Sequence, residues 1–196
     1  MAALHELVTI VSGLTLREKP SHNSLGEVHL IQVRDVANPY LEIDDDLLRI
    51  PLTAVPPQQL LQPHDLLLLA KGPRNPVLLY DKPWRYAAAM SFFFRLRIHD
   101  PATTHPGYLA WYLNSTPGQA ALLSLRQGSS VAGITKPLLA ALEIPVPNLT
   151  TQRHIARVAD ALLRETKLTD ALRAKRAQAI EQALLNQIND HERRNL

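Results

Sequence analysis

The sequence predicts an α+β protein: a domain built on a twisted, mixed β-sheet with short helices, followed by one long C-terminal helix. Three observations lead to this prediction. Short apolar runs separated by turn residues occupy much of residues 5–97, as expected of strands in an antiparallel or mixed sheet. Two segments between 106 and 125 have helical spacing instead. From Thr151 to Asn189 there is neither Gly nor Pro, which is typical of a long helix.

The strands follow from short apolar runs bracketed by turns. Residues 28–33 alternate apolar with polar side chains, as a half-buried strand does, and the run 66–70 lies between Asp65 and the Lys71-Gly72 turn. Residues 5–12 are interpreted as a strand or a helix-to-strand entry. Prolines and glycines place loops at 14–26, 38–39 and 71–76. The strands expected, in order, are 5–12, 28–33, 41–43, 66–70, 77–80 and 91–97.

The helices of the domain begin at Pro or Thr. Pro106 suits the first turn of a helix over 106–114, and a second short helix is expected over 119–125. Thr135 is a plausible N-cap for a short helix that follows. Pro145 and Pro147 then end the domain.

About 38 residues of unbroken helix are roughly 55–60 Å long. A lone domain cannot cover the apolar side of such a helix, so we expect it to pack against a second helix as an antiparallel coiled coil. This divides the chain into a β-sheet domain (1–149), a long dimerisation helix (150–190) and a polar tail (191–196). The packing residues expected on the helix are Ile155, Val158, Leu162, Leu172, Ile180 and Leu184.

Charge is segregated along the chain. The net charge is +3, the pI is near 9.3 and residues 1–150 are neutral overall, yet Lys71 to Arg97 contains six basic residues against Asp81 alone. Such a domain can present one basic face to phosphates. The chain has no cysteine, its N-terminus lacks the pattern of a signal peptide, and no apolar run is long enough to cross a bilayer. We therefore expect a soluble, cytoplasmic protein.

No motif in the sequence carries catalytic chemistry. The eight histidines show no metal-ligand spacing, and neither a P-loop nor a Gly-x-Gly-x-x-Gly string is present. Asp44-Asp45-Asp46 is interpreted as a solvated turn, and Asn38-Pro39-Tyr40 as a turn rather than a methyltransferase motif. We expect no catalytic residue, no metal site and no cofactor. A hydrolase or nuclease would instead require metal-dependent turnover by the purified chain.

Six segments form an ordered set of motifs over nearly the whole chain. In the last of them, Leu-Glu-Ile-Pro-Val-Pro leads through Gln152 into the long helix. The segments are 8–15, 26–36, 65–72, 108–115, 128–135 and 142–155. As an ordered set they resemble the target-recognition half of specificity subunits in type I restriction–modification systems. That family usually has two recognition domains and two spacer helices in one chain, and usually a Glu just before the equivalent of Gln152.

The resemblance implies sequence-specific recognition of double-stranded DNA in a phage-defence complex. It also implies that residues 1–149 are the DNA target-recognition domain and residues 150–190 the spacer helix. A half-length chain is expected to form a homodimer through its helix, or to pair with a different half, and to dock methyltransferase subunits; a restriction or translocase subunit is a further partner that the resemblance allows. S-adenosylmethionine, ATP and Mg are expected only in those partners. The residues expected to contact DNA are Lys71, Arg74, Asn75, Lys82, Arg85, Arg126, Gln127, Ser129 and Ser130.

One alternative function remains open. The chain could be a protein-interaction adaptor with a helical dimerisation arm and no DNA binding of its own. Salt distinguishes the two, because duplex binding weakens steeply as salt rises and an adaptor has no duplex affinity.

Overall fold

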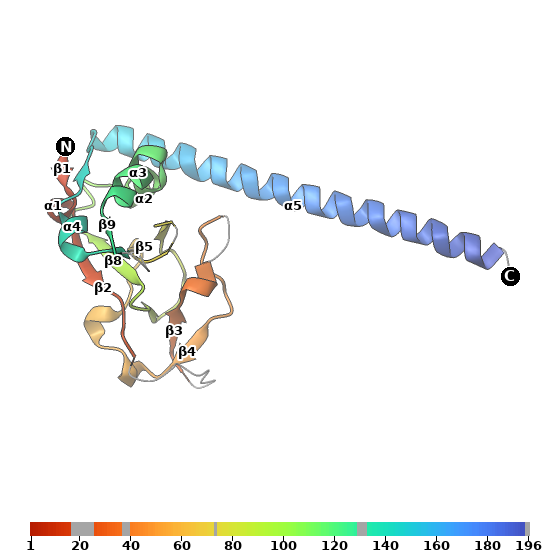
Figure 1. Cartoon of the computed structure of the whole chain (residues 1–196), viewed down its shortest axis with the longest axis horizontal. Helices are drawn as coiled ribbons and strands as arrows, with labels where there is room; N and C mark the ends of the chain where they lie inside the picture. Colours follow the sequence, from red (N-terminus) through yellow and green to blue (C-terminus); the bar gives the residue numbers. More distant parts are fainter. Residues whose placement is uncertain (17–25, 37–39, 73, 129–132, 195–196) are drawn as a thin grey trace. The chain divides into compact units, whose positions relative to one another are not determined.

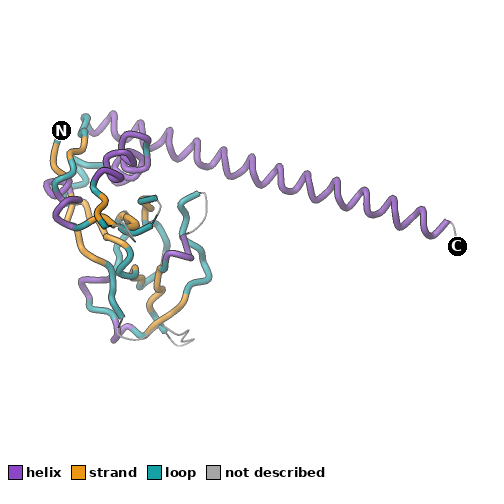
Figure 2. The backbone as a smooth tube through the Cα atoms, viewed as in Figure 1, coloured by secondary structure: helices purple, strands orange, loops and turns teal. Residues whose placement is uncertain are grey.

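The computed structural model describes residues 1–16, 26–36, 40–72, 74–128 and 133–194 (Figure 1). It divides into two compact units, Met1–Arg157 and Val158–Leu196. The first unit contains all the strands and the short helices, and the second consists of the long helix (Figure 2). The expected boundary between 149 and 150 therefore lies inside a helix whose first residues belong to the first unit.

The larger sheet of the first unit has four antiparallel strands in the order β2-β8-β5-β6. Leu66–Leu69 is paired on both sides, with Leu67 opposite Arg95 in one neighbour and Leu78 in the other. All four leucines of this strand are buried, as the continuous apolar run predicts. The strands are β2 (Val8–Ser12), β8 (Phe93–Ile98), β5 (Leu66–Leu69) and β6 (Val77–Leu79).

A second sheet has three strands in the order β4-β3-β7, and it is mixed. β3 (Val28–Ile31) pairs antiparallel with β4 (Leu48–Ile50) and parallel with β7 (Ala87–Ala89). The predicted mixed β-structure is thus confirmed, although it is divided between two principal sheets rather than lying in one. Two two-stranded ribbons complete it: β1 (Ala2–Ala3) with β11 (Glu143–Ile144), and β9 (Arg126–Gln127) with β10 (Gly133–Ile134).

The short helices gather at one end of the first unit, and β3 and β4 lie toward the other (Figure 1). The apolar core at the helical end joins Leu66 and Leu96 of the larger sheet to Leu109 and Leu113 of α2 and Leu139 of α4. The helices are α1 (Leu4–Leu7), α2 (Pro106–Asn114), α3 (Thr116–Ser124) and α4 (Lys136–Ala140), with 3₁₀ turns η1 (Val33–Val36), η2 (Leu52–Ala54) and η3 (Pro57–Gln59).

The second unit is part of one continuous helix, α5 (Leu149–Arg194), of 46 residues. At 1.5 Å per residue it is roughly 69 Å long. It is longer at its C-terminus than expected and includes most of the segment predicted to be a polar tail. Exposed apolar residues recur along it, among them Val158, Leu162, Leu168, Leu172, Ile180 and Leu184.

The structure differs from the predicted elements in several places. Residues 41–43 form no strand, because Leu41 has a φ of 54°, which interrupts extended backbone. Strands β4 and β7 were not expected. Thr135 does precede α4, but its side chain makes no capping hydrogen bond. The loop prediction for 17–25 and the turn at 38–39 lie outside the described residues.

Candidate nucleic-acid interface

Two segments predicted to contact DNA lie side by side although they are far apart in sequence. Lys71, which follows β5, forms a β-bridge with Gly133 of the β9–β10 ribbon, and the Ile134 backbone N–H donates to the Ala70 carbonyl at 2.9 Å. The ribbon pairs Gly133 with Gln127. Lys71 and the ribbon strand that contains Arg126 and Gln127 therefore belong to one backbone framework. We call this framework, together with Arg74 three residues after Lys71, the 71–133 surface.

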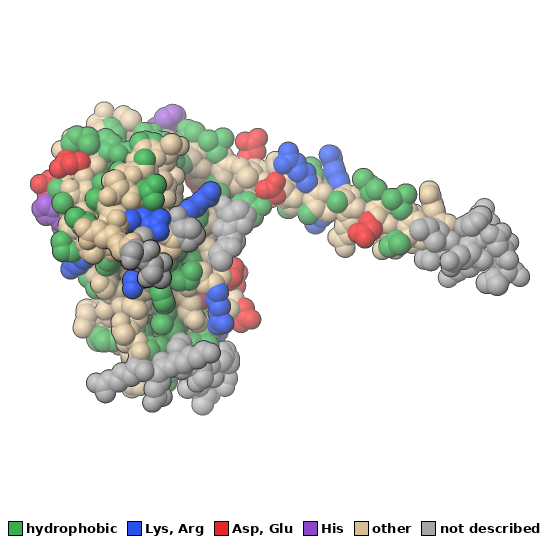
Figure 3. All heavy atoms as spheres, in the orientation of Figure 1, with side chains coloured by type: hydrophobic (Ala, Val, Ile, Leu, Met, Phe, Trp, Pro, Cys, Tyr) green, Lys and Arg blue, Asp and Glu red, His purple; other side chains and the backbone are tan. Residues whose placement is uncertain are grey.

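The 71–133 surface presents polar side chains to solvent. Lys71, Arg74 and Gln127 are exposed, and Arg126 is half-buried. Gly72 and Gly128 have φ values of 141° and 108°, in the region that favours glycine, and these two residues make the turns that carry the exposed side chains. Ser129 and Ser130 lie outside the described residues. In the view of Figure 3 Lys and Arg side chains gather near the middle of the first unit.

Asn75 does not share this exposure. It is 2 % exposed, and its side-chain amide donates to the Leu69 backbone carbonyl at 2.8 Å. The backbone carbonyl of Asn75 accepts from Gln119 Nε2 at 2.9 Å. Because the amide is buried and bonded within the domain, this placement gives Asn75 a structural role in the loop and does not support its predicted contact with bases.

A hollow of about 520 Å³ lies beside Arg74. Its other walls come from the apolar and polar side chains of α3 and from the loop before β6. Asn114, in the same wall, bonds Val77 of β6 through both its amide atoms, accepting from the backbone N–H at 3.0 Å and donating to the carbonyl. The lining residues are Leu41, Arg74, Asn75, Pro76, Asn114, Thr116, Gln119, Ala120 and Leu123.

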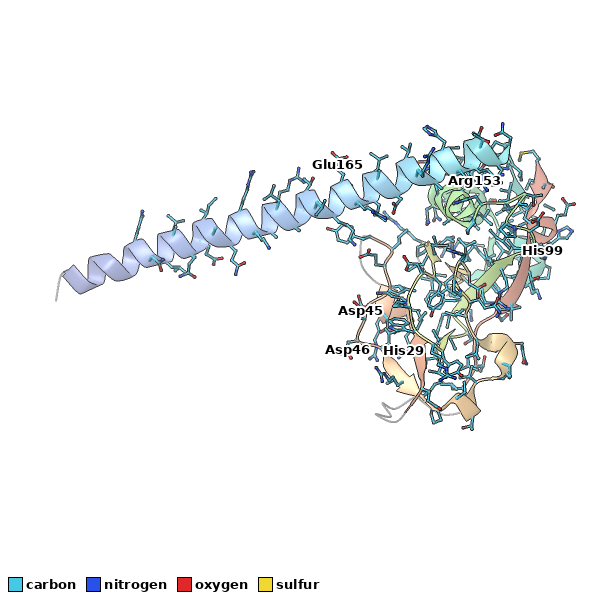
Figure 4. All side chains as sticks on the ribbon, turned by 180° about the vertical axis from the view of Figure 1, so that it is seen from behind. His29, Asp45, Asp46, His99, Arg153 and Glu165 are labelled. Carbon is cyan, nitrogen blue, oxygen red and sulfur yellow. The ribbon has the colours of Figure 1, made fainter. Side chains whose placement is uncertain are left out.

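Lys82 and Arg85 belong to a different cluster. Lys82 Nζ lies 2.6 Å from Asp45 Oδ1 and 5.4 Å from the centre of the Trp84 ring, which stacks on His29 at 4.4 Å. The carboxylate already offsets the lysine charge, which leaves less of it for a phosphate. Arg85 is exposed and lies over the Tyr86 ring at 5.1 Å. Figure 4 labels His29, Asp45 and Asp46 in this part of the unit.

Arg95 and Arg97, on one face of β8, have a structural role. Arg97 donates to both oxygens of the buried Asp65 at 2.7 Å, and Arg95 Nη1 donates to the carbonyls of Gln58 and Leu60. Burial, and secondly the neighbouring Arg97, lower the pKa of Arg95. These groups anchor η3 and the start of β5 to the sheet.

Gln152, in the first turn of α5, is completely buried and makes three hydrogen bonds. Its Oε1 accepts from the His105 backbone N–H at 2.8 Å, and its Nε2 donates to the carbonyls of Thr103 and Pro147 at 2.9 and 2.7 Å. One amide thereby joins the start of α2 to the start of α5. The motif 142–155 contains this glutamine, but the sequence alone gave no reason to predict that its side chain connects the two helices.

The described ranges lack the arrangement of side chains that a metal site needs. They contain no group of three His, Asp or Glu side chains placed to hold a metal ion. Asp44, Asp45 and Asp46 are exposed, as expected of a solvated turn. Within those same ranges no helix combines the length and apolar character needed to cross a membrane.

No protein-family model matches the chain. A search of curated proteins gives a type I restriction enzyme specificity subunit, StySPI, from Salmonella potsdam, which is 24% identical over 173 residues. The match covers 87% of this chain and 37% of the StySPI subunit, so the chain spans well under half the length of its curated relative.

Solved structures with a similar fold are also type I S subunits or come from a type I R-M system. The S subunit of a type I restriction–modification system from M. genitalium matches with a TM-score of 0.56 at 17% identity, over 82% of this chain and 37% of that one. The HsdS subunit from Thermoanaerobacter tengcongensis gives 0.58 at 20% identity, over 84% and 37%. A chain from a study of complex assembly and conformational transition in the type I R-M system gives 0.63 at 22% identity, over 95% and 42%.

The architecture is therefore that of a mixed α+β domain followed by a long helix, the class of fold found in these S subunits. Within that class the chain resembles one half of a type I restriction–modification specificity subunit, and the comparisons confirm the resemblance that the ordered motifs indicated.

Proposed function

We propose that this chain reads one half-site in double-stranded DNA as a half-length specificity subunit of a type I-like restriction–modification or related defence complex. The observation that carries the proposal is the 71–133 surface: exposed Lys71, Arg74 and Gln127 on one backbone framework, in a fold otherwise found in specificity subunits. The chain's part is recognition, without catalysis.

Side chains that recognise bases must be held on a rigid part of the protein. Phosphate contacts position a protein on the duplex, while side chains that reach base edges read the sequence. Lys and Arg can bind phosphate or guanine, and Gln suits adenine. The loop that carries Arg74 is held in place by the buried Asn75, which is hydrogen-bonded to Leu69 and Gln119. Less conformational freedom of the loop is therefore lost when Arg74 binds DNA.

In this proposal α5 sets the distance between two recognition domains and provides the surface on which partner subunits dock. Its exposed apolar residues, including Leu162, Leu172 and Ile180, need a second helix to remove them from water, which a second copy can provide in antiparallel orientation. Such a homodimer presents two reading surfaces and recognises a bipartite, palindromic site. Methyltransferase subunits, and a restriction or translocase subunit, dock on this assembly and hold the S-adenosylmethionine, ATP and Mg, none of which the chain itself requires.

The test compares Arg74→Ala with Arg49→Ala. Both remove one exposed arginine, but Arg49 lies on β4, away from the 71–133 surface. After selection of bound duplexes from a random pool, with the chain alone and with its cognate methyltransferase, affinity is measured by fluorescence anisotropy over a range of salt. We expect Arg74→Ala to cost about 1–3 kcal/mol of duplex binding, while Arg49→Ala binds like wild type.

Equal affinity of the two variants would remove the 71–133 surface from the DNA contact. Absence of any salt-sensitive duplex binding by the wild-type chain, alone and with the methyltransferase, would favour the adaptor function instead. Neither outcome depends on the identity of the recognised bases.

A further inference from the structure

A second cationic feature lies at the start of α5, separate from the 71–133 surface. A hollow of about 440 Å³ is lined by His105, Thr150, Arg153 and Arg157, all within the first compact unit. His105 precedes α2, and the other three residues occupy the first turns of α5. Figure 4 labels Arg153 beside the short helices.

The charge of this hollow is positive and without a counterion inside the unit. Arg153 and Arg157 are one turn apart and share a side of the helix. No carboxylate lines the hollow, and neither guanidinium makes an ion pair with any of the described residues. Arg97 and Lys82, by contrast, form ion pairs with Asp65 and Asp45.

The surroundings favour an anion further. The backbone N–H groups in the first turn of α5 have no intrahelical acceptors; Asn148 accepts from Thr151 N–H, and the hollow is lined by Thr150. The long helix directs the positive end of its dipole to this point. Burial, and secondly Arg153 and His64, lower the pKa of His105, so Arg153 lies close enough to act on the ring.

The side chains that line the hollow favour a phosphate group that belongs to a larger molecule. Two guanidiniums on successive turns provide several N–H donors close together, an arrangement that suits phosphate oxygens. Arg153, Arg157 and Thr150 are exposed, so the hollow is accessible to a group held on a polymer. Ile155, the first residue of the apolar stripe, lies about 160–200° around the helix from either arginine, so a partner helix on that stripe leaves the hollow open.

We infer that this hollow binds a backbone phosphate of duplex DNA, a contact that rests on the proposed function and adds a second attachment point to it. The contact positions the domain on the duplex and carries no sequence information. It is therefore expected to strengthen binding to every duplex by the same factor.

The experiment uses the full chain and the Arg153→Gln/Arg157→Gln double variant. Two single-charge controls accompany it: Lys175→Gln, an exposed cation further along α5, and Arg74→Ala. Duplex affinity is measured against salt on the selected site and on an unrelated duplex. We expect the double variant to bind both duplexes about tenfold more weakly at fixed salt and to lower the slope of log K against log salt by about one. Lys175→Gln is expected to leave both unchanged.

The outcomes separate this inference from the proposed function. A wild-type slope in the double variant overturns the phosphate contact while duplex recognition stands, and a loss confined to the selected site overturns it too, because a backbone contact is independent of sequence. If the wild-type chain binds no duplex, the proposed function fails first. A titration with inorganic phosphate, followed at the His105 ring by NMR, then tells whether the hollow holds free phosphate only.

Discussion

Gln152 is the residue on which the start of the long helix most depends. It has no exposed surface, and its one side chain accepts from a backbone N–H before α2 and donates to two carbonyls. Glutamine is suited to this position because it alone among uncharged side chains of its length both donates and accepts.

We predict that Gln152→Leu lowers the free energy of unfolding by about 3 kcal/mol, because it removes three hydrogen bonds made by a completely buried side chain, to His105 N–H and to the carbonyls of Thr103 and Pro147. Urea unfolding followed by circular dichroism measures the change. Thr151→Ala, at the exposed neighbouring position, is the control and should stay within about 0.5 kcal/mol of wild type. A Gln152→Leu protein as stable as wild type would show that α5 does not need this junction.

His105 gives a prediction in pH. Its pKa is lowered first by burial and then by the Arg153 cation. The folded chain therefore binds fewer protons than the unfolded chain below about pH 6.5, so stability falls as pH decreases through that range and levels off below the folded pKa. Arg153→Gln should move the His105 pKa part of the way back up, since burial remains. NMR titration of the His105 ring checks this, and an unmoved pKa would mean that Arg153 does not act on the ring.

At the scale of elements, close backbone contacts decide where strands meet. Gly13 follows β2, and a Cβ there would lie 2.2 Å from the Met90 carbonyl oxygen and 2.6 Å from that of Ala89. The Leu14 backbone N–H donates to the same Ala89 carbonyl at 2.7 Å. A side chain at residue 13 would separate the end of β2 from β7.

We predict that Gly13→Ala destabilises the first unit by about 3 kcal/mol, because both clashing atoms are backbone and cannot move aside without breaking strand contacts. Ser12→Ala, an exposed change one residue earlier, should have little effect. Thermal unfolding of the two variants and the wild type makes the comparison. An unchanged Tm for Gly13→Ala would show that the β2–β7 junction yields at low cost.

Elements that are specified locally were predictable, and those created by pairing were not. α2 begins and ends where the sequence predicts because Pro106 suits a first turn and its apolar spacing is helical. β7 is a run of three alanines, which have low strand propensity, and it becomes a strand through parallel pairing with β3. In the candidate site, the exposure of Arg74 followed from its loop, whereas the burial of Asn75 depends on Leu69 and Gln119.

At the scale of the whole chain, most apolar side chains of the first unit are buried in three core clusters, while those of the second remain in water. Leu162 is 57% exposed and Leu172 50%. Burying a leucine side chain is worth about 1.5–3 kcal/mol, so repeated exposure of this kind favours association of the helix with another. In a twofold dimer both copies of each such residue are buried, so each contributes twice to the stability of the dimer.

We predict that the full chain is a dimer in solution and that Leu162→Asp/Leu172→Asp is a monomer, because two carboxylates per chain would have to be desolvated in an apolar contact. Light scattering or sedimentation equilibrium at several concentrations measures the mass. Gln178→Asp adds the same kind of charge on the side of the helix away from Leu162 and should remain dimeric. A monomeric wild-type chain that becomes larger only with a methyltransferase would mean that the stripe is covered by that partner rather than by a second copy. A double variant that keeps the dimer mass would place the contact between copies elsewhere on the chain.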